Sequence, residues 1–296
     1  MNAKTKKRSK VKQAKKKLKK LNRKNASSAV RTRKPYSSDM SKAAWERLKP
    51  HIPTTKIGGR PRSVCIKEVI NAMLYVLHTG CPWRSLPHDF PTWSTVYDYF
   101  RKWSKNGVFL KINSVLTVGY RKHAGREGYP SAAIIDSQSV KTNSFVGGEI
   151  GYDGGKKIKG RKRFILTDTM GLVLVAMVCS AGLSEKAGAM QMLQRIKQTS
   201  PLAQICNRIK LVWADGGYQG NELAQFVLEL WNWIWTIVKR KEEQKGFEVL
   251  PRRWVVERTL GWFNYRRRLS KDYEINTTHS ESMIYLAMIS IIVKRY

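Results

Sequence analysis

Two short apolar strands, each followed directly by an aspartate, constrain the fold of this chain more than any other feature. The first is predicted over residues 131–135 and leads into Asp136, and the second over 209–214 and leads into Asp215. Strands made almost wholly of apolar residues are typical of the centre of a sheet that is covered on both faces. A carboxylate at the end of such a strand is held rigidly and can still face a cleft.

A third acidic residue, Glu257, lies in the first turns of a helix predicted to begin near Arg252, among several arginines. Clustered carboxylates repel one another unless cations offset their charge. Mg²⁺ and Mn²⁺ prefer all-oxygen ligands, and two such ions can clamp a phosphoryl displacement, one activating water or a 3′-hydroxyl and the other stabilising the leaving 3′-oxygen. Asp136, Asp215 and Glu257 are therefore the predicted catalytic and metal-binding residues. The alternative is that these acids form ordinary ion pairs with nearby arginines.

From about residue 130 onward the hydrophobic pattern alternates strands with helices, which is typical of a mixed α/β domain. Further strands are predicted over 163–169, 172–181 and 231–238, and further helices over 184–198, 221–230 and 281–293. The first two of these strands are expected to form a hairpin through Met170 and Gly171. The tryptophans of the third are expected to pack in the core.

The region before this domain has a helical pattern. Ser41 precedes a short helix ending near Leu48, a second helix is predicted over 66–78 before Gly80, and a third starts between Thr92 and Thr95 and ends near Gly107. Helix, short turn and helix, with Arg101 and Lys102 on the last element, fit a helix-turn-helix DNA reader. The alternative is an ordinary helical subdomain whose aromatic residues are core.

The charge of the chain indicates a polyanionic partner. The formal net charge is +35, and residues 1–34 contribute 16 Lys and Arg with no acid, which leaves +35 − 16 = +19 for the remainder. Lysines and arginines on phosphates release condensed counterions, which favours binding to nucleic acid. The arm 1–34 is expected either to become helical on phosphate or to be a disordered solubilising tail.

The four cysteines are scattered without a CxxC pair, which favours a reducing compartment over a disulfide framework. The basic N-terminus is not followed by an apolar segment, and no apolar run approaches the roughly 20 residues of a membrane helix. We expect a soluble protein that is cytoplasmic and associated with the nucleoid.

A glycine-rich and basic segment over 147–163 lies between the first aspartate and the hairpin. It lacks the spacing of a P-loop, so ATP is not expected. The segment is predicted to follow a phosphate backbone beside the active site, and a mobile solvated loop is the alternative.

Several motifs in order resemble one family. The segments AIIDSQSVKT (133–142), GYDGGKK (151–157), WADGGY (213–218) and RWVVERT (253–259), with TGCPWRSLP (79–87) and WSTVY (93–97) upstream, resemble the transposases of bacterial insertion sequences. The similarity is to the insertion-sequence-five (IS4/IS5-like) family of the DDE superfamily. It implies a ribonuclease-H-like catalytic domain with Asp136, Asp215 and Glu257 as metal ligands. It also implies cleavage at terminal inverted repeats followed by 3′-hydroxyl attack on target DNA.

Two positions depart from the wider superfamily pattern around the glutamate. Arg253 and Glu257 fit it, but Leu250 stands where a tyrosine is usual and Asn264 where a basic residue is usual. The arginines at 266–268 are close enough in sequence to supply that charge.

These observations predict a basic arm (1–34), a helical DNA-binding domain (35–125) and a ribonuclease-H-like catalytic domain (126–296). The fold class expected is α/β, a mixed sheet flanked by helices. Side chains expected to contact DNA are Arg84, Ser94, Thr95, Arg101, Lys102, Lys141, Lys156, Lys157, Lys159, Arg161, Arg253, Arg258 and Arg267. We expect an active transposase that uses two Mg²⁺ or Mn²⁺ ions and pairs two element ends as a homo-oligomer. The alternatives are a catalytically silent DNA-binding regulator and a nuclease of the same fold.

Overall fold

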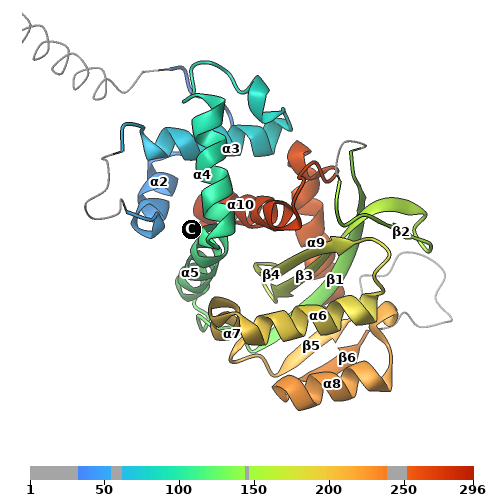
Figure 1. Cartoon of the computed structure of the whole chain (residues 1–296). Coiled ribbons are helices and arrows are strands. Elements are labelled where there is room, and N and C mark those ends of the chain that lie inside the picture. The colour runs from blue at the N-terminus through green and yellow to red at the C-terminus, as the bar shows by residue number, and fades with distance from the viewer. Residues whose placement is uncertain (1–32, 55–61, 144–146, 239–251) are drawn as a thin grey trace, which may run out of the picture.

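The computed structural model describes residues 33–54, 62–143, 147–238 and 252–296 (Figure 1). Nearly all of the predicted basic arm, and Leu250, lie outside these residues. The described chain forms a mixed sheet with helices on both faces and a group of N-terminal helices beside it. None of its helices is long and apolar enough to cross a membrane.

The strands of the described chain form one six-stranded sheet. They are β1 (Ala132–Lys141), β2 (Gly151–Asp153), β3 (Ile158–Asp168), β4 (Val173–Ser180), β5 (Leu211–Ala214) and β6 (Ile234–Ile237). The order is β4–β3–β1–β5–β6, with β3 antiparallel to β4 and β1, and β5 parallel to β1 and β6. β2 pairs with the first residues of β3. The mixed architecture and the early hairpin are confirmed.

Two strands extend beyond their predicted boundaries, because polar residues continue them. β1 runs past Asp136 to Lys141, which pairs with Gly160 of β3. β3 correspondingly begins at Ile158, so the end of the predicted glycine-rich loop is strand. A side chain at Gly160 would collide with the backbone of β1, which explains why glycine stands at this close approach. Asp136 therefore lies within a strand and not at its end.

Helices cover the two faces of the sheet (Figure 1). They are α6 (Glu185–Gln198), α7 (Ser200–Cys206) and α8 (Asn221–Trp231) on one face, and α9 (Arg253–Asn264) and α10 (Thr277–Arg295) on the other. Ala133 and Ile135 of β1 belong to the same apolar cluster as α6 and α8, whereas Ile134 packs with Val255 and Val256 of α9. Because side chains of a strand alternate between faces, the side chain two positions after Ile134 faces α9. That side chain is Asp136.

The N-terminal helices are α2 (Lys42–Leu48), α3 (Ile66–Thr79), α4 (Trp93–Lys105) and α5 (Val108–His123), and all of them contact α10. The sequence does not predict α5, because Gly107 reads as a helix end, whereas its left-handed backbone (φ 64°) lets the next helix start at once. α10 is buried from His279 to Val293, so these helices and the sheet share one core around it. The domain boundary at 125/126 stays a prediction.

The connection between α3 and α4 differs from a short helix-turn-helix turn. It runs from Gly80 to Thr92 and includes a 3-10 turn at Trp83–Ser85, whereas three or four residues are usual. Phe100 and Trp103 of α4 are buried, as expected of core aromatic residues. A helical N-terminal region is confirmed, and base reading by α4 stays a prediction.

Substitutions at two glycines inside helices test how closely α6 packs on the sheet. A Cβ at Gly188 in α6 would overlap the ring of Phe164 on β3, whereas a Cβ at Gly261 in α9 would meet nothing within 4 Å. We expect Gly188→Ala to lower the free energy of unfolding by about 1–3 kcal/mol through overpacking. Gly261→Ala should raise it by about 0.5–1 kcal/mol, since alanine favours helix more than glycine does. Urea denaturation measures both, and a stable Gly188→Ala variant would contradict the close packing.

Candidate active site

The parallel pairing of β1 with β5 brings Asp136 and Asp215 together. That pairing places Ile134 opposite Trp213, and each aspartate follows two residues later. Continuing the register puts both aspartates at the same level on neighbouring chain segments, about 4.8 Å apart in paired strands.

Each of these two aspartates is held by a nearby backbone donor. Asp215 caps the short 3-10 helix η3 (Gly216–Tyr218), and its Oδ1 atom accepts a hydrogen bond from the N–H of Gly217 at 2.8 Å. The N–H of Ser137 donates to Oδ1 of Asp136 at 2.7 Å. One oxygen of each carboxylate is thereby fixed in position.

Glu257 approaches from α9, the helix that packs on β1 through Val255 and Val256. Arg253, one turn earlier, contacts two of the three acids. Its Nη2 atom lies 3.3 Å from Oε1 of Glu257 and 3.7 Å from Oδ2 of Asp215. The alternative in which the acids pair with arginines is thus what the structure shows for these two residues.

Asp136 lies in an environment that disfavours its charge. Burial raises the pKa of its carboxyl to about 6; the hydrogen bond from Ser137 acts against this rise, and the charge of Asp215 adds to it. Arg253 and Lys156 are near enough to lower the pKa in part. A bound cation relieves such a build-up of negative charge.

The donor set fits a divalent metal ion. Carboxylate oxygens from Asp136, Asp215 and Glu257 are the hard ligands that Mg²⁺ and Mn²⁺ prefer. The guanidinium of Arg253 already supplies a cation between two of them. In the ranges that the structure describes, no three His, Cys, Asp or Glu side chains are grouped as they would be around a metal.

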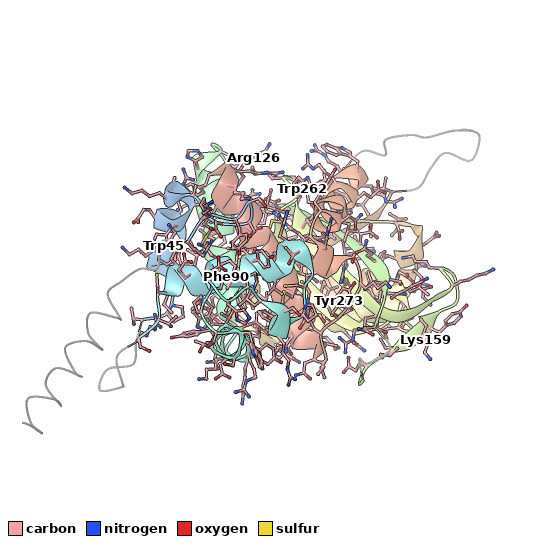
Figure 2. All side chains as sticks on the ribbon, turned by 90° about the horizontal axis from the view of Figure 1, so that it is seen from above. Trp45, Phe90, Arg126, Lys159, Trp262 and Tyr273 are labelled. Carbon is pink, nitrogen blue, oxygen red and sulfur yellow. The ribbon has the colours of Figure 1, made fainter. Side chains whose placement is uncertain are left out.

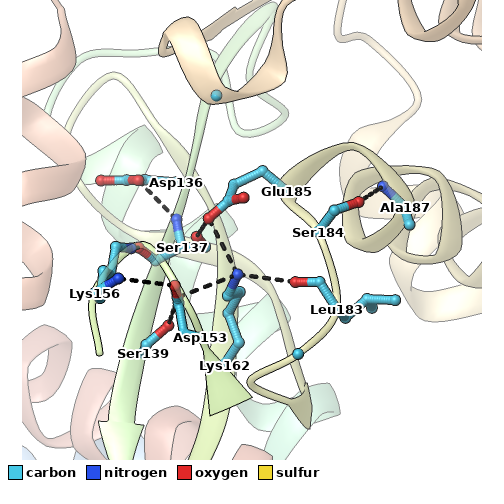
Figure 3. Close-up of polar contacts among 12 residues, drawn as sticks. Asp136, Ser137, Ser139, Asp153, Lys156, Lys162, Leu183, Ser184, Glu185 and Ala187 are labelled. Atoms are coloured by element: carbon cyan, nitrogen blue, oxygen red, sulfur yellow. Dashed lines mark hydrogen bonds and ion pairs between the residues drawn. The ribbon is translucent and has the colours of Figure 1, made fainter. Parts of the chain in front are cut away.

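A buried lysine organises the α6 side of β1 (Figure 3). The Nζ atom of Lys162 lies 3.1 Å from Oε1 of Glu185 and 3.3 Å from Oδ2 of Asp153. Neither Lys162 nor Glu185 stands out in the sequence, where Lys162 is the middle one of three consecutive basic residues. Strand alternation is the sequence feature that could have distinguished Lys162, because it places Lys162 on the opposite face of β3 from Arg161 and Arg163.

Asp153 also stabilises the tight turn between β2 and β3, which carries Lys156. Its carboxylate accepts hydrogen bonds from the hydroxyl of Ser139 and, at 3.0 Å, from the N–H of Lys156 (Figure 3). The ammonium of Lys156 donates to the backbone oxygen of Ser137 at 3.3 Å, next to Asp136. The GYDGGKK motif therefore places one lysine beside the candidate site.

Arg161, predicted to contact DNA, is a structural residue. Its side chain is 0 % exposed and donates to the backbone oxygens of Glu149, Glu274 and Ile275. It also forms an ion pair with Asp272 at 3.3 Å. A guanidinium enclosed in this way cannot reach a phosphate, so Arg161 does not belong to the DNA-contacting set.

The other predicted DNA contacts are exposed or half-buried and fall into two groups along the chain. The catalytic part carries Lys141, Lys156, Lys157, Lys159, Arg253, Arg258 and Arg267, and the N-terminal helices carry Arg84, Ser94, Thr95, Arg101 and Lys102. Lys159 lies at the outer end of the β2–β3 hairpin (Figure 2). Arg258 is partly engaged elsewhere, because its guanidinium stacks on Trp254 and Trp262 and donates to the backbone oxygen of Met170. Arg84 and Ser94 line a pocket of about 600 Å³.

The network around Asp153 has a testable pH dependence. Burial alone would raise the pKa of Asp153, but the hydrogen bonds from Ser139 and Lys156 and the charge of Lys162 outweigh it and lower that pKa to about 2. The folded state therefore binds the proton less tightly than the unfolded state. The stabilisation by Asp153 is fully present above about pH 4 and is lost as the pH falls towards 2.

We expect Asp153→Asn to lower the free energy of unfolding by about 2 kcal/mol at pH 7 and by much less at about pH 2.5. Asp98→Asn, which removes an exposed ion pair with Arg101, is the control and should cost less than about 1 kcal/mol at either pH. Urea denaturation at both pH values gives the comparison. A difference between wild type and Asp153→Asn that does not change with pH would contradict the assignment.

Two family models and one curated relative match this chain. Residues 128–292, more than half of the chain, match the family described as "Transposase DDE domain", and residues 40–113 match the family described as "Putative transposase of IS4/5 family". A relative from Burkholderia cepacia, "Putative transposase for insertion sequence element IS402", is 28% identical over 119 residues, which are 39% of this chain and 54% of the relative. The chain thus spans about half the length of the curated relative it matches.

Among solved structures, the "Mos1 transposase paired-end complex with left transposon end" is similar with a TM-score of 0.26 and 12% identity, covering 85% of this chain and 83% of that chain. The match over 128–292 includes every strand of the sheet and all three acids. The fold is ribonuclease-H-like, and the chain belongs to the transposase DDE family, with an N-terminal region that is similar to the IS4/5 transposases.

Proposed function

We propose that this protein is the transposase of an insertion sequence, which binds the terminal inverted repeats of its element, cuts DNA there and joins the freed 3′-hydroxyl ends to target DNA. The observation that supports this proposal is that Asp136 and Asp215 lie at one level of two paired strands, while Arg253 bridges Asp215 and Glu257 of α9. A cluster of hard oxygen donors on a chain of net charge +35 suits metal-assisted chemistry on a phosphodiester.

In this proposal the three acids hold two Mg²⁺ or Mn²⁺ ions. Bound there, the ions would activate the attacking oxygen and stabilise the leaving 3′-oxygen. The β1–β5 register fixes Asp136 and Asp215 relative to each other, and α9 supplies Glu257. Lys156, held by Asp153 beside Asp136, is positioned to contact the DNA backbone next to the bond that breaks.

The partner is double-stranded DNA, both as element ends and as target, and a homo-oligomer pairs the two ends. The helical segment 35–125 supplies the contacts that select the ends, and the protein acts in the cytoplasm at the nucleoid. A catalytically silent regulator and a nuclease without strand transfer are the competing functions. A cleavage and joining experiment distinguishes the transposase, the regulator and the nuclease.

Cleavage and joining of DNA that carries the flanks of the gene test the catalytic proposal. We expect wild-type protein with Mg²⁺ to cut at the 3′ ends and join them, and Asp215→Asn to lose at least about 100-fold in rate, as does EDTA-treated wild type. Glu229→Gln removes an exposed acid on α8 that pairs with Gln225, and should keep full activity. Salt-sensitive DNA binding without cutting would contradict the transposase proposal and favour a catalytically silent regulator. Cutting without end selection or joining would favour a nuclease.

The exposed lysines of the β2–β3 hairpin provide a second test. If Lys157 and Lys159 contact phosphates, each Lys→Gln variant should weaken binding to all DNA sequences alike and reduce the slope of log K against log salt by about 1. Lys197→Gln is the matched control, because Lys197 lies on α6 and its ammonium donates to the backbone oxygen of Leu230. Fluorescence anisotropy over a salt series gives the slopes, and unchanged slopes would remove the hairpin from the DNA interface.

A further inference from the structure

We propose that Arg253 is an internal counter-ion, which occupies the metal-binding side of Asp215 and Glu257 until a divalent ion displaces it. This inference rests on the proposed function, because it takes these two acids as metal ligands. It gives Arg253 a role in the protein before any DNA is bound, in addition to a contact with DNA.

The geometry of Arg253 is that of a bridging cation. It stands one helical turn before Glu257 at the start of α9, and its Nη2 atom lies 3.3 Å from Oε1 of Glu257 and 3.7 Å from Oδ2 of Asp215. One nitrogen thus joins carboxylates from two separate elements. The side chains are 21 % (Arg253), 30 % (Asp215) and 51 % (Glu257) exposed, so a solvated ion can reach the bridge.

No other cation takes this place in the described part of the chain. There, the ion pairs of both Asp215 and Glu257 are with Arg253, and Asp215 also accepts a hydrogen bond from the N–H of Gly217. Asp136, at the same level as Asp215, adds a further negative charge nearby. Without Arg253 or a metal ion, these acids would repel one another.

A metal ion and Arg253 compete for the same oxygens. Mg²⁺ binds carboxylate oxygens at about 2.1 Å, so it cannot use Oδ2 of Asp215 and Oε1 of Glu257 while the guanidinium remains between them. Breaking both ion pairs therefore subtracts from the affinity for the metal. The displaced guanidinium becomes free for a DNA phosphate, which its planar fork of donors suits.

The test is a calorimetric titration of the full chain with Mn²⁺ in the absence of DNA. Arg253→Gln removes the competitor. Arg252→Gln is the matched control: it removes one positive charge at the adjacent position, where the guanidinium lies 5.7 Å from the ring centre of Trp213. Arg253→Lys keeps the charge without the fork, and circular dichroism confirms that each variant is folded.

We expect Arg253→Gln to bind Mn²⁺ about 3–10-fold more tightly than wild type, and Arg252→Gln to change the affinity by less than about twofold. Arg253→Lys should lie between wild type and Arg253→Gln. In EDTA the melting temperature of Arg253→Gln should be below that of wild type, and saturating Mn²⁺ should raise it by more than it raises that of wild type.

Equal Mn²⁺ affinities of wild type and Arg253→Gln would overturn the counter-ion role, as would equal increases in Mn²⁺ affinity in Arg253→Gln and Arg252→Gln. Either result would leave the proposal of metal-dependent cleavage unaffected. Weaker binding by Arg253→Gln would also overturn it, because Arg253 would then support the metal site. If wild type binds no more Mn²⁺ than Asp215→Asn does, the metal site and the proposed function fail together.

Discussion

The parallel pairing of β1 with β5 is the interaction on which the rest of the structure depends. It places Asp136 and Asp215 at one level, and it is set by apolar residues on both faces. A slip of one residue would turn Asp136 towards α6 and bring Ile135 to the α9 face, because side chains alternate along a strand. Such a slip would take the Asp136 carboxylate away from the face that Asp215 and α9 share. The packing that stabilises the fold therefore also fixes the two aspartates.

Part of the high positive charge of this chain is structural. Arg161 and Arg163 on one face of β3 donate to backbone oxygens of the segment before α10, and burial lowers the pKa of Arg163 to about 10. Buried carbonyl groups of a loop need donors, and these two arginines provide them. Lys162 on the other face binds acids beside the candidate site. A net charge taken from the sequence thus overstates the positive charge that is exposed at the surface.

The features that the sequence predicts correctly are those that depend on residues close together in the chain. Ser41 precedes and caps α2, Gly80 ends α3 in a left-handed conformation, and α6 spans nearly the predicted range. The apolar strands before Asp136 and Asp215 are also where they were predicted. The role of Glu257 as a third metal ligand, which the family motifs imply, stays a prediction.

The features that sequence could not predict depend on distant partners. Arg161 looks like a DNA contact until the backbone oxygens of Glu274 and Ile275 are placed around it. The role of Lys162 beside the candidate site depends on Glu185 and Asp153, which converge on its ammonium group. The ion pairs of Arg253 likewise require β5 and α9 to be side by side. In each case the type of residue can be read from the sequence, but its role depends on partners that only the tertiary fold brings close.

The central position of α10 also has a consequence for how the protein is made. The helices α2 to α5 bury their apolar faces against this helix, yet the ribosome produces α10 after every other described element. At about 5–20 residues per second, roughly 8–30 s pass between the synthesis of α5 and that of α10. During that interval the nascent chain exposes apolar surface that chaperones recognise. The N-terminal helices thus reach their final packing only after translation has passed residue 295.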